Sequence, residues 1–432
     1  MLLEALLSNL IQIGTLSVTF PDGSKKQFGS GGEPRAALEI RTNRVKRRLV
    51  LNPALALGEA YMDGDLVPSS GNIFEPLDFL TLNWMEGGQH LFDKALEKFR
   101  RLKRWVDQFN SVKTSKRNVA HHYDLDGRLY SMMLDEDMQY SCAYFPEGNE
   151  SLEEAQLKKK RHISAKLKLD RPGLEVVDIG CGWGGMAIFL AREYDVRVTG
   201  LTLSEEQLKV ATRRAQEAGL SDRVSFKLLD YRNLSGLVDR VVSVGMFEHV
   251  GVDHYKTFFD KVRSMLKRDG VALIHAIGRA DGPGSTNPWI AKYIFPGGYS
   301  PALSEVLSVV EKSGLWVTDV EILRLHYAKT LEQWRQRFEK NRATLAGLYD
   351  ERFCRMFEFY LIVSELAFRR MGHMNWQLQL TRDIAALPLS RDYIVDDERR
   401  RSTVLPYQHG KDKISNQNLP ASDSAGRGNK GA

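Results

Sequence analysis

The sequence predicts an α/β fold whose larger part is a doubly wound, mostly parallel sheet, preceded by a small N-terminal α/β domain. From residue 174 onward, short apolar runs alternate with helical segments, and a glycine-rich turn follows the first run. We expect strands at 174–179, 196–201, 224–229, 238–245 and 270–277, with helices at 187–193, 204–218 and 254–266. Strand–helix–strand units join parallel strands by right-handed crossovers, which places helices on both faces of the sheet.

The chain is long enough for more than one domain. Its 432 residues, 43% of them hydrophobic, suggest two or three domains of about 150 residues. Residues 1–14 place leucines at helical spacing, and residues 15–28 alternate apolar side chains before a Pro21-Asp22-Gly23 turn, which predicts a helix and then a hairpin. The start lacks basic residues and a small-residue cleavage site, so we interpret it as an amphipathic helix and not a signal peptide. We assign residues 1–85 to the N-terminal domain.

Two basic segments separate this domain from the first strand of the main sheet. We expect residues 86–117 to form a basic amphipathic linker helix, because apolar side chains recur at helical spacing within 91–109 among lysines and arginines. The second segment is the run Lys158, Lys159, Lys160 and Arg161. Both segments and the net charge of +6 suit an anionic partner. Over binding to such a partner, we slightly favour packing between domains for the helix and a solvated face for the run.

The remaining composition limits the functional classes. Cys142, Cys181 and Cys354 are far apart in the chain, so neither a disulfide framework nor a metal site is expected. No apolar stretch approaches the roughly 20 residues of a membrane-spanning helix. We place the main domain at 118–390 and expect a polar and disordered tail at 391–432, which includes residues 410–432 and has almost no aromatic residues.

The turn after the first predicted strand has the composition of a cofactor loop. It reads DIGCGWGG from Asp178 to Gly185, and its glycines let the backbone turn tightly and approach a ligand at a helix N-terminus. A purely structural turn and a nicotinamide site are the alternatives. Two details favour S-adenosylmethionine: Asp178 precedes the glycines, and the G-x-G-x-x-G spacing holds only if Gly184 is ignored.

The ends of the next two strands supply further cofactor candidates. No acid follows the second strand, where ribose hydroxyls are usually bound, so Thr202 and Gln207 are candidates for that contact. Asp230 and Tyr231 end the third strand, where an adenine amino group would be read. An acid at such a place is more often a cap or turn residue.

A series of motifs in a fixed order resembles one enzyme family. The motifs are HYDL (122–125), YSCAYF (140–145), VDIGCGWGG (177–185), GLTLSEEQ (200–207), FEHVG (247–251) and YIFPGG (293–298). Together they resemble the cyclopropane-fatty-acyl-phospholipid synthase family, which includes the mycolic acid cyclopropane synthases. The resemblance implies a Rossmann-like class I methyltransferase domain. Departures are the Asp126-Gly127-Arg128 sequence after HYDL and a loose match over the first 110 residues.

The resemblance also implies a reaction and a base. One carbon of S-adenosylmethionine would be added to the cis double bond of a phospholipid acyl chain, and a carbocation deprotonated by bound bicarbonate would close the ring. The implied bicarbonate site is Cys142, Glu248, His275, Ile277 and Tyr327. Taken singly, Glu248 could cap a helix, His275 could be a core histidine and Cys142 a small buried hydrophobe.

The implied cofactor residues come from four motifs. They are Tyr140 and Ser141 near the methionine part, Gly180 and Gly182 in the loop, Thr202 and Gln207 at the ribose, and Tyr231 and Arg232 near adenine, with Trp183 as a neighbour. Aromatic residues that could either line the acyl chain or pack in the core are Tyr144, Phe145, Phe247, Tyr293 and Phe295.

Other functions remain open from the sequence. The enzyme could stop at methyl or methylene transfer without closing a ring, or it could be a lipid-binding protein with a vestigial cofactor site. A nucleic-acid methyltransferase would need a base pocket and stacking residues, and no such motif accompanies the loop, so we expect no nucleic-acid partner. The resemblance further implies a homodimer in the cytoplasm, peripherally associated with the anionic inner face of the membrane.

Overall fold

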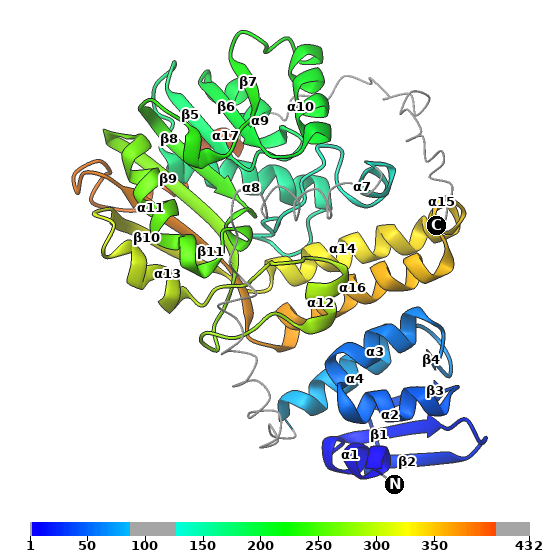
Figure 1. The fold of residues 1–432 in the computed structure, drawn as a ribbon. Helices are drawn as coiled ribbons and strands as arrows, with labels where there is room; N and C mark the ends of the chain where they lie inside the picture. Colours follow the sequence, from blue (N-terminus) through cyan, green and yellow to red (C-terminus); the bar gives the residue numbers. More distant parts are fainter. Residues whose placement is uncertain (1, 87–126, 403–432) are drawn as a thin grey trace, which may run out of the picture.

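Two α/β regions joined by a layer of helices make up the molecule (Figure 1). The computed structural model describes residues 2–86 and 127–402. All but the first residue of the predicted linker helix at 86–117 lies outside the described residues, as do the HYDL motif and the chain beyond 402.

The N-terminal region, blue in Figure 1, is a small mixed sheet packed with helices. Its strand order is β2-β1-β3-β4, with β1 antiparallel to β2 and parallel to β3. The elements are α1 Leu2–Leu10, β1 Gly14–Thr19, β2 Lys25–Gly31, β3 Arg35–Ile40, α2 Asn43–Leu51, α3 Pro53–Met62, β4 Leu66–Pro68 and α4 Phe74–Glu86. The predicted N-terminal helix and hairpin are confirmed, and α4 ends next to the boundary expected at residue 85.

The main sheet has seven strands in the order β10-β11-β9-β8-β5-β6-β7. Its strands are β5 Glu175–Ile179, β6 Arg197–Thr202, β7 Val224–Leu228, β8 Val238–Val244, β9 Leu266–Arg279, β10 Trp316–Leu323 and β11 His373–Thr381. The five strands from β7 to β9 are parallel, while β11 runs antiparallel to both β9 and β10. The doubly wound sheet and its five expected strands are therefore confirmed.

Helices cover both faces of this sheet, as the alternation of strands and helices predicted. The covering helices are α8 Leu152–Leu167, α9 Gly185–Tyr194 and α10 Glu205–Glu217 on one face, and α11 Tyr255–Met265 and α13 Leu303–Val310 on the other. Each face has its own apolar core: Ile163 and Leu167 belong to the first, and Phe258 and Val306 to the second.

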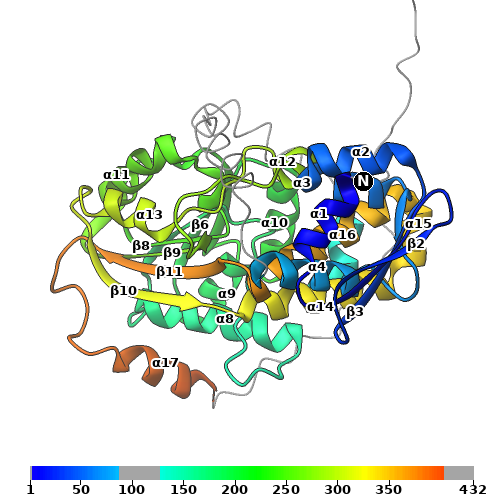
Figure 2. The same ribbon diagram turned by 90° about the horizontal axis from the view of Figure 1, so that it is seen from below.

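A layer of helices connects the two regions. It consists of α7 Gly127–Met133, α12 Pro288–Tyr293, α14 His326–Lys340, α15 Arg342–Leu348 and α16 Glu351–Arg370. Seen from below, α3 and α4 of the N-terminal region lie against α16 (Figure 2). The Tyr61 hydroxyl donates to Glu358 over 2.5 Å, and Lys292 pairs with Glu59 at 2.7 Å. Buried polar contacts thus hold the N-terminal region to the layer.

Two expectations about polar segments are wrong. The tail expected from residue 391 begins with a helix, α17 Asp392–Ser402, in which Ile394 is buried and Glu398 lies 2.6 Å from His162 of α8. The basic run at 158–161 belongs to α8, and there Lys159 and Lys160 are buried instead of facing solvent. In both cases charged side chains meet buried partners that come from distant parts of the chain.

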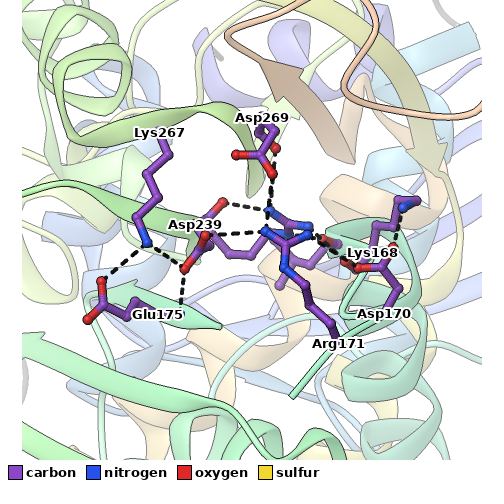
Figure 3. Close-up of polar contacts among 9 residues, drawn as sticks. Lys168, Asp170, Arg171, Glu175, Asp239, Lys267 and Asp269 are labelled. Carbon is purple, nitrogen blue, oxygen red and sulfur yellow. Dashed lines mark hydrogen bonds and ion pairs between the residues drawn. The ribbon is translucent and has the colours of Figure 1, made fainter. Parts of the chain in front are cut away.

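A charged network fixes the amino-terminal edge of the main sheet, opposite the edge where the cofactor loop lies. Asp239 accepts the backbone N–H of Glu175 at 2.8 Å and pairs with Lys267 at 3.0 Å, as Figure 3 shows. Behind Asp239, the buried Arg240 donates to the carbonyls of Leu167, at 2.6 Å, and Lys168, at 3.0 Å. The network thus ties the end of α8 to the first residues of β5, β8 and β9.

We predict that Arg240→Met lowers the free energy of unfolding by about 3 kcal/mol, because it leaves buried carbonyl groups without donors. Lys267→Met is the matched control in the same network: Lys267 is partly exposed, so its loss should cost no more than about 1 kcal/mol. Urea unfolding followed by circular dichroism measures both values. Equal losses would contradict the structural role assigned to Arg240.

Candidate active site

A cavity lies at the carboxyl ends of the parallel strands, where α/β sheets bind their ligands. Its floor comes from the turns after β5, β6 and β8, and η1 Tyr231–Asn233 closes one side after β7. Residues 138–141, which precede α8 and belong to no strand, form the remaining wall. The site thus combines loops that the sheet brings together with one segment held from outside it.

The glycine loop has the backbone geometry of a ligand cradle. Gly180, Gly182 and Gly184 all have positive φ, at +82°, +54° and +84°. A Cβ on Gly180 would lie 2.7 Å from the Met246 side chain, whereas a Cβ on Gly182 would meet no atom within 4 Å. The helix α9 begins directly after the loop, so its free N–H groups face the same space. The loop therefore leaves room for a ligand over Gly182.

The turns after β6 and β7 hold the candidate ribose and adenine residues. The Thr202 hydroxyl donates to the Gln207 side-chain oxygen at 2.7 Å, and the Ser204 side chain caps α10. Asp230 caps η1 and pairs with the Arg232 guanidinium at 2.7 Å. The cap interpretation of Asp230 is thus confirmed, and its carboxylate is already engaged by its neighbour.

All the residues predicted to bind the cofactor line this one cavity. They are Tyr140, Ser141, Gly180, Gly182, Thr202, Gln207, Tyr231 and Arg232, together with the neighbour Trp183. The prediction missed several other lining residues, among them Met138, Gln139, Met246 and His249. Only His249 carried a signal, because it lies within the FEHVG motif. Burial lowers its pKa to about 4, so its imidazole is neutral at pH 7.

None of the five predicted bicarbonate residues lines the cavity. Glu248 accepts the backbone N–H of Ile277 at 2.6 Å through one carboxylate oxygen. Its other oxygen is buried and has no hydrogen-bond partner among the described residues. Burial raises the pKa of Glu248 to about 7, although the bond from Ile277 acts in the opposite direction. Glu248 lies in the turn η2 Phe247–His249 and caps no α-helix.

Cys142 and Tyr327 lie near the wall at 138–141 but do not line the cavity. Cys142 is fully buried next to Ser141, and burial raises the pKa of its thiol well above the ordinary value. The ring of Tyr327 packs edge-on against Trp334, with 5.8 Å between ring centroids, and Trp334 stacks on Tyr140 at 5.0 Å. These contacts place both residues behind Tyr140 and Ser141.

His275 has different surroundings from the other four predicted bicarbonate residues. Its two ring nitrogens lie 3.2 Å from the Gln377 amide and 3.3 Å from the Asn375 amide, both on β11. Burial, assisted by the charge of Lys159, lowers its pKa to about 3. The structure therefore joins Glu248 to Ile277 directly, while the His275 ring is held by β11.

Of the aromatic residues proposed to line an acyl chain, Phe295 lies nearest the cavity. Its ring is 6.1 Å from that of His249 and 5.8 Å from that of Tyr360, whose hydroxyl is 2.7 Å from the hydroxyl of Tyr140. Phe247 instead packs in the core against Phe258 and Trp376, Tyr144 stacks on His162, and Tyr293 bonds Glu59 of the N-terminal region. For these three residues the packing interpretation is correct.

The wall at 138–141 is preceded by a partly buried charge cluster. Asp137 forms close ion pairs with Lys160 of α8 and Arg214 of α10. Arg214 also donates to the carbonyl of Trp183 at 2.8 Å, so one guanidinium connects the wall to the glycine loop. Burial opposes ionisation of Asp137, but the two cations outweigh it and hold its pKa well below the usual range.

Comparison with known proteins identifies similar chains over both regions. The family described as "Mycolic acid cyclopropane synthetase" matches residues 110–378, and a domain described only as of unknown function matches residues 2–75. Cyclopropane-fatty-acyl-phospholipid synthase of Escherichia coli K12 is 37% identical over 84% of this chain and 92% of its own length. A probable fatty acid methyltransferase of Pseudomonas putida is 37% identical over 81% of this chain and 87% of its own length.

Solved structures agree with these sequence relatives. The mycolic acid cyclopropane synthase CmaA1, crystallised with SAH and CTAB, superimposes with a TM-score of 0.58 at 32% identity. The superposition covers 61% of this chain and 97% of that one.

We predict that Asp137→Asn lowers the free energy of unfolding at neutral pH by about 3 kcal/mol, since it removes the one carboxylate that pairs with both the buried Lys160 and the partly buried Arg214. The pKa of Asp137 is lowered in the folded state, so its contribution is complete above the unfolded pKa of about 3.9 and is lost as the pH falls further. The difference between variant and wild type should therefore shrink in urea unfolding below about pH 4. Asp195→Asn, which affects an exposed pair, is the control and should change stability little at either pH.

Proposed function

This chain belongs to the mycolic acid cyclopropane synthetase family, and we propose that it converts cis double bonds of phospholipid acyl chains into cyclopropane rings with S-adenosylmethionine. Its fold is that of a class I S-adenosylmethionine-dependent methyltransferase. One observation carries the proposal: a single cavity gathers every predicted cofactor residue, and next to its lining residue His249 stands Glu248, whose second carboxylate oxygen is buried and has no hydrogen-bond partner among the described residues.

The cavity suits a sulfonium cofactor. The open space over Gly182 accommodates a ligand close to the backbone, and the N-terminus of α9 faces it. A neutral His249 does not repel the positive sulfonium, whereas a protonated imidazole would. The aromatic rings of Tyr140, Tyr360 and Phe295 offer π faces to a cation that forms nearby. We propose that the eight predicted residues, from Tyr140 to Arg232, bind this cofactor.

The surroundings of Glu248 suit bicarbonate. Within the described part of the chain, the second carboxylate oxygen of Glu248 is an acceptor without a donor, and the O–H of bicarbonate is such a donor. Bicarbonate, when bound, supplies a base for the proton that leaves as the ring closes. The Tyr327 hydroxyl and groups of Cys142, His275 and Ile277 are proposed to complete the site. Since the N–H of Ile277 already donates to Glu248, that N–H would be shared.

A second function stays close to the first. Methyl or methylene transfer to an unsaturated acyl chain, without ring closure, uses the same cofactor and cavity. The observation in its favour is the relative in Pseudomonas putida, named a probable fatty acid methyltransferase, which is as similar to this chain as the Escherichia coli cyclopropane synthase. The two functions differ in how the cation loses its proton.

Access to lipid is the remaining part of the proposal. No described helix is both long and apolar enough to cross a bilayer. We propose that the enzyme works as a homodimer bound to the anionic cytoplasmic face of the membrane. The net charge of +6 favours binding to an anionic surface.

We expect purified protein, given labelled S-adenosylmethionine, bicarbonate and vesicles of cis-unsaturated anionic phospholipid, to add one CH₂ per double bond and remove the unsaturation. Mass spectrometry of the released fatty acids, with a chemical test for residual double bonds, makes the measurement. A gained methyl or methylene with the double bond retained would establish the second function. No labelled lipid would refute both.

We expect Glu248→Gln to slow ring formation by about 100-fold or more. The substitution replaces one of the two carboxylate oxygens by an NH₂ group and removes the negative charge, so the side chain no longer binds the O–H of the proposed bicarbonate as the carboxylate does. Its affinity for S-adenosylhomocysteine should stay within about twofold of wild type. Glu150→Gln is a matched control: Glu150 is equally buried but bonds Lys158 and backbone N–H groups away from the cavity. A Glu248→Gln enzyme with full activity would exclude the proposed base site.

A further inference from the structure

Lys159 is a lysine with no exposed surface, in the middle of α8. Burial of a charged side chain is costly unless it is hydrogen-bonded and paired, so such a residue needs an explanation. Its ammonium donates to the side-chain oxygen of Gln139 at 2.6 Å and to the hydroxyl oxygen of Ser141 at 2.8 Å. Both partners line the cavity.

A second residue of α8 holds the backbone of the same segment. The Gln156 amide, one helical turn before Lys159, donates to the carbonyl of Ser141 at 3.0 Å and to that of Gln139 at 3.3 Å. Gln156 is also fully buried. Together the two residues of α8 bind the cavity wall through its backbone and through its side chains.

The ammonium group determines the direction of the Ser141 hydroxyl. A lysine ammonium has three donors and no acceptor, so the Ser141 oxygen must accept from Lys159. The single O–H donor of Ser141 must then point away from Lys159. Ser141 lies in the wall of the cavity, and the cavity offers this donor a place for a ligand acceptor.

We propose that Lys159 is a positioning residue for the cofactor: it fixes the wall at 138–141 and orients the Ser141 hydroxyl as a donor toward the cofactor carboxylate. This inference rests on the proposed use of S-adenosylmethionine, and it does not depend on the lipid substrate or on ring closure. Because Lys159 touches the wall and not the ligand, its action is indirect.

The charges around Lys159 agree with this role. Burial lowers its pKa to about 8, although the Asp135 carboxylate acts in the opposite direction. The titratable groups that interact with it are Asp135, Asp137, Cys142, Lys160, Asp178 and His275. Cys142 and His275 are neutral at pH 7 because burial shifts the pKa of each in the direction of its neutral form. Lys159 is therefore charged at neutral pH and loses its proton in mildly alkaline solution.

Lys166 on the same helix provides a matched control. It is also fully buried and paired, but its partners Asp319 and Glu321 belong to β10, away from the cavity. Lys159→Met and Lys166→Met thus each remove a buried, hydrogen-bonded ammonium from α8. Only the first removes a contact to the cavity wall.

The test measures S-adenosylhomocysteine affinity by calorimetry, with no lipid present. We expect Lys159→Met to weaken binding about tenfold at neutral pH, equivalent to about 1.4 kcal/mol, and Lys166→Met to change it less than about twofold. The ratio of Lys159→Met to wild-type Kd should fall as the pH rises from 7 to about 9, because the neutral amine gains a lone pair and no longer forces the Ser141 hydroxyl to point away from it. Titration of the ligand itself cancels in this ratio.

Three results would overturn the proposal: wild-type affinity in Lys159→Met, equal weakening in both variants, or a Kd ratio independent of pH. If Lys159→Met does not fold, the test uses Lys159→Gln, because the glutamine side chain is neutral, shorter than lysine and still fits a polar site. The same outcomes apply to this variant. Failure of the lipid assay together with the expected binding results would refute the proposed function and leave the role of Lys159 intact. Absence of any S-adenosylhomocysteine binding by wild type would refute both.

Discussion

The structure depends on the parallel pairing of β5 between β6 and β8. Parallel strands end at one edge, so this pairing places the turns after Ile179, Thr202 and Val244 side by side. The N–H groups of Gly180 and Cys181 both donate to the carbonyl of Leu201 at 2.9 Å, which fixes the glycine loop to the next strand. Every other feature of the cavity is arranged around this edge.

The sheet alone does not complete the cavity. The wall at 138–141 has no strand to pair with, and it is held instead by side chains of α8 and α10. Arg214 contacts both Asp137 and the loop carbonyl of Trp183, while Lys159 contacts the wall from behind. Such bonds are directional, so they hold the wall in one position, which apolar packing of the same area would do less strictly. This explains why Lys159 and Lys160 of α8 are buried next to the wall.

Sequence reasoning predicted the parts of the fold that local pattern encodes. The five parallel strands are apolar runs, so they could be located, and most of the predicted cofactor residues stand in short motifs directly after them and line one cavity. It missed β11, whose buried face carries Asn375, Gln377 and Gln379 and therefore lacks an apolar run. It also misjudged Lys159 and α17, since the partners that bury their charges lie far away in the chain. Long-range polar contacts leave no periodic signal in sequence.

The missed elements form one polar layer, and that layer has a consequence for the site. Between α8 and the sheet, Gln156, Lys159 and Lys166 on the helix and Gln377 and Gln379 on β11 are all buried. Burial of so many polar groups lowers stability compared with an apolar interface. The His275 ring lies in this layer, held by two β11 amides, and its neighbour Ile277 reaches Glu248 through the backbone. The strand β9 thus connects the polar layer to the carboxylate of Glu248, because His275 and Ile277 stand two residues apart on it.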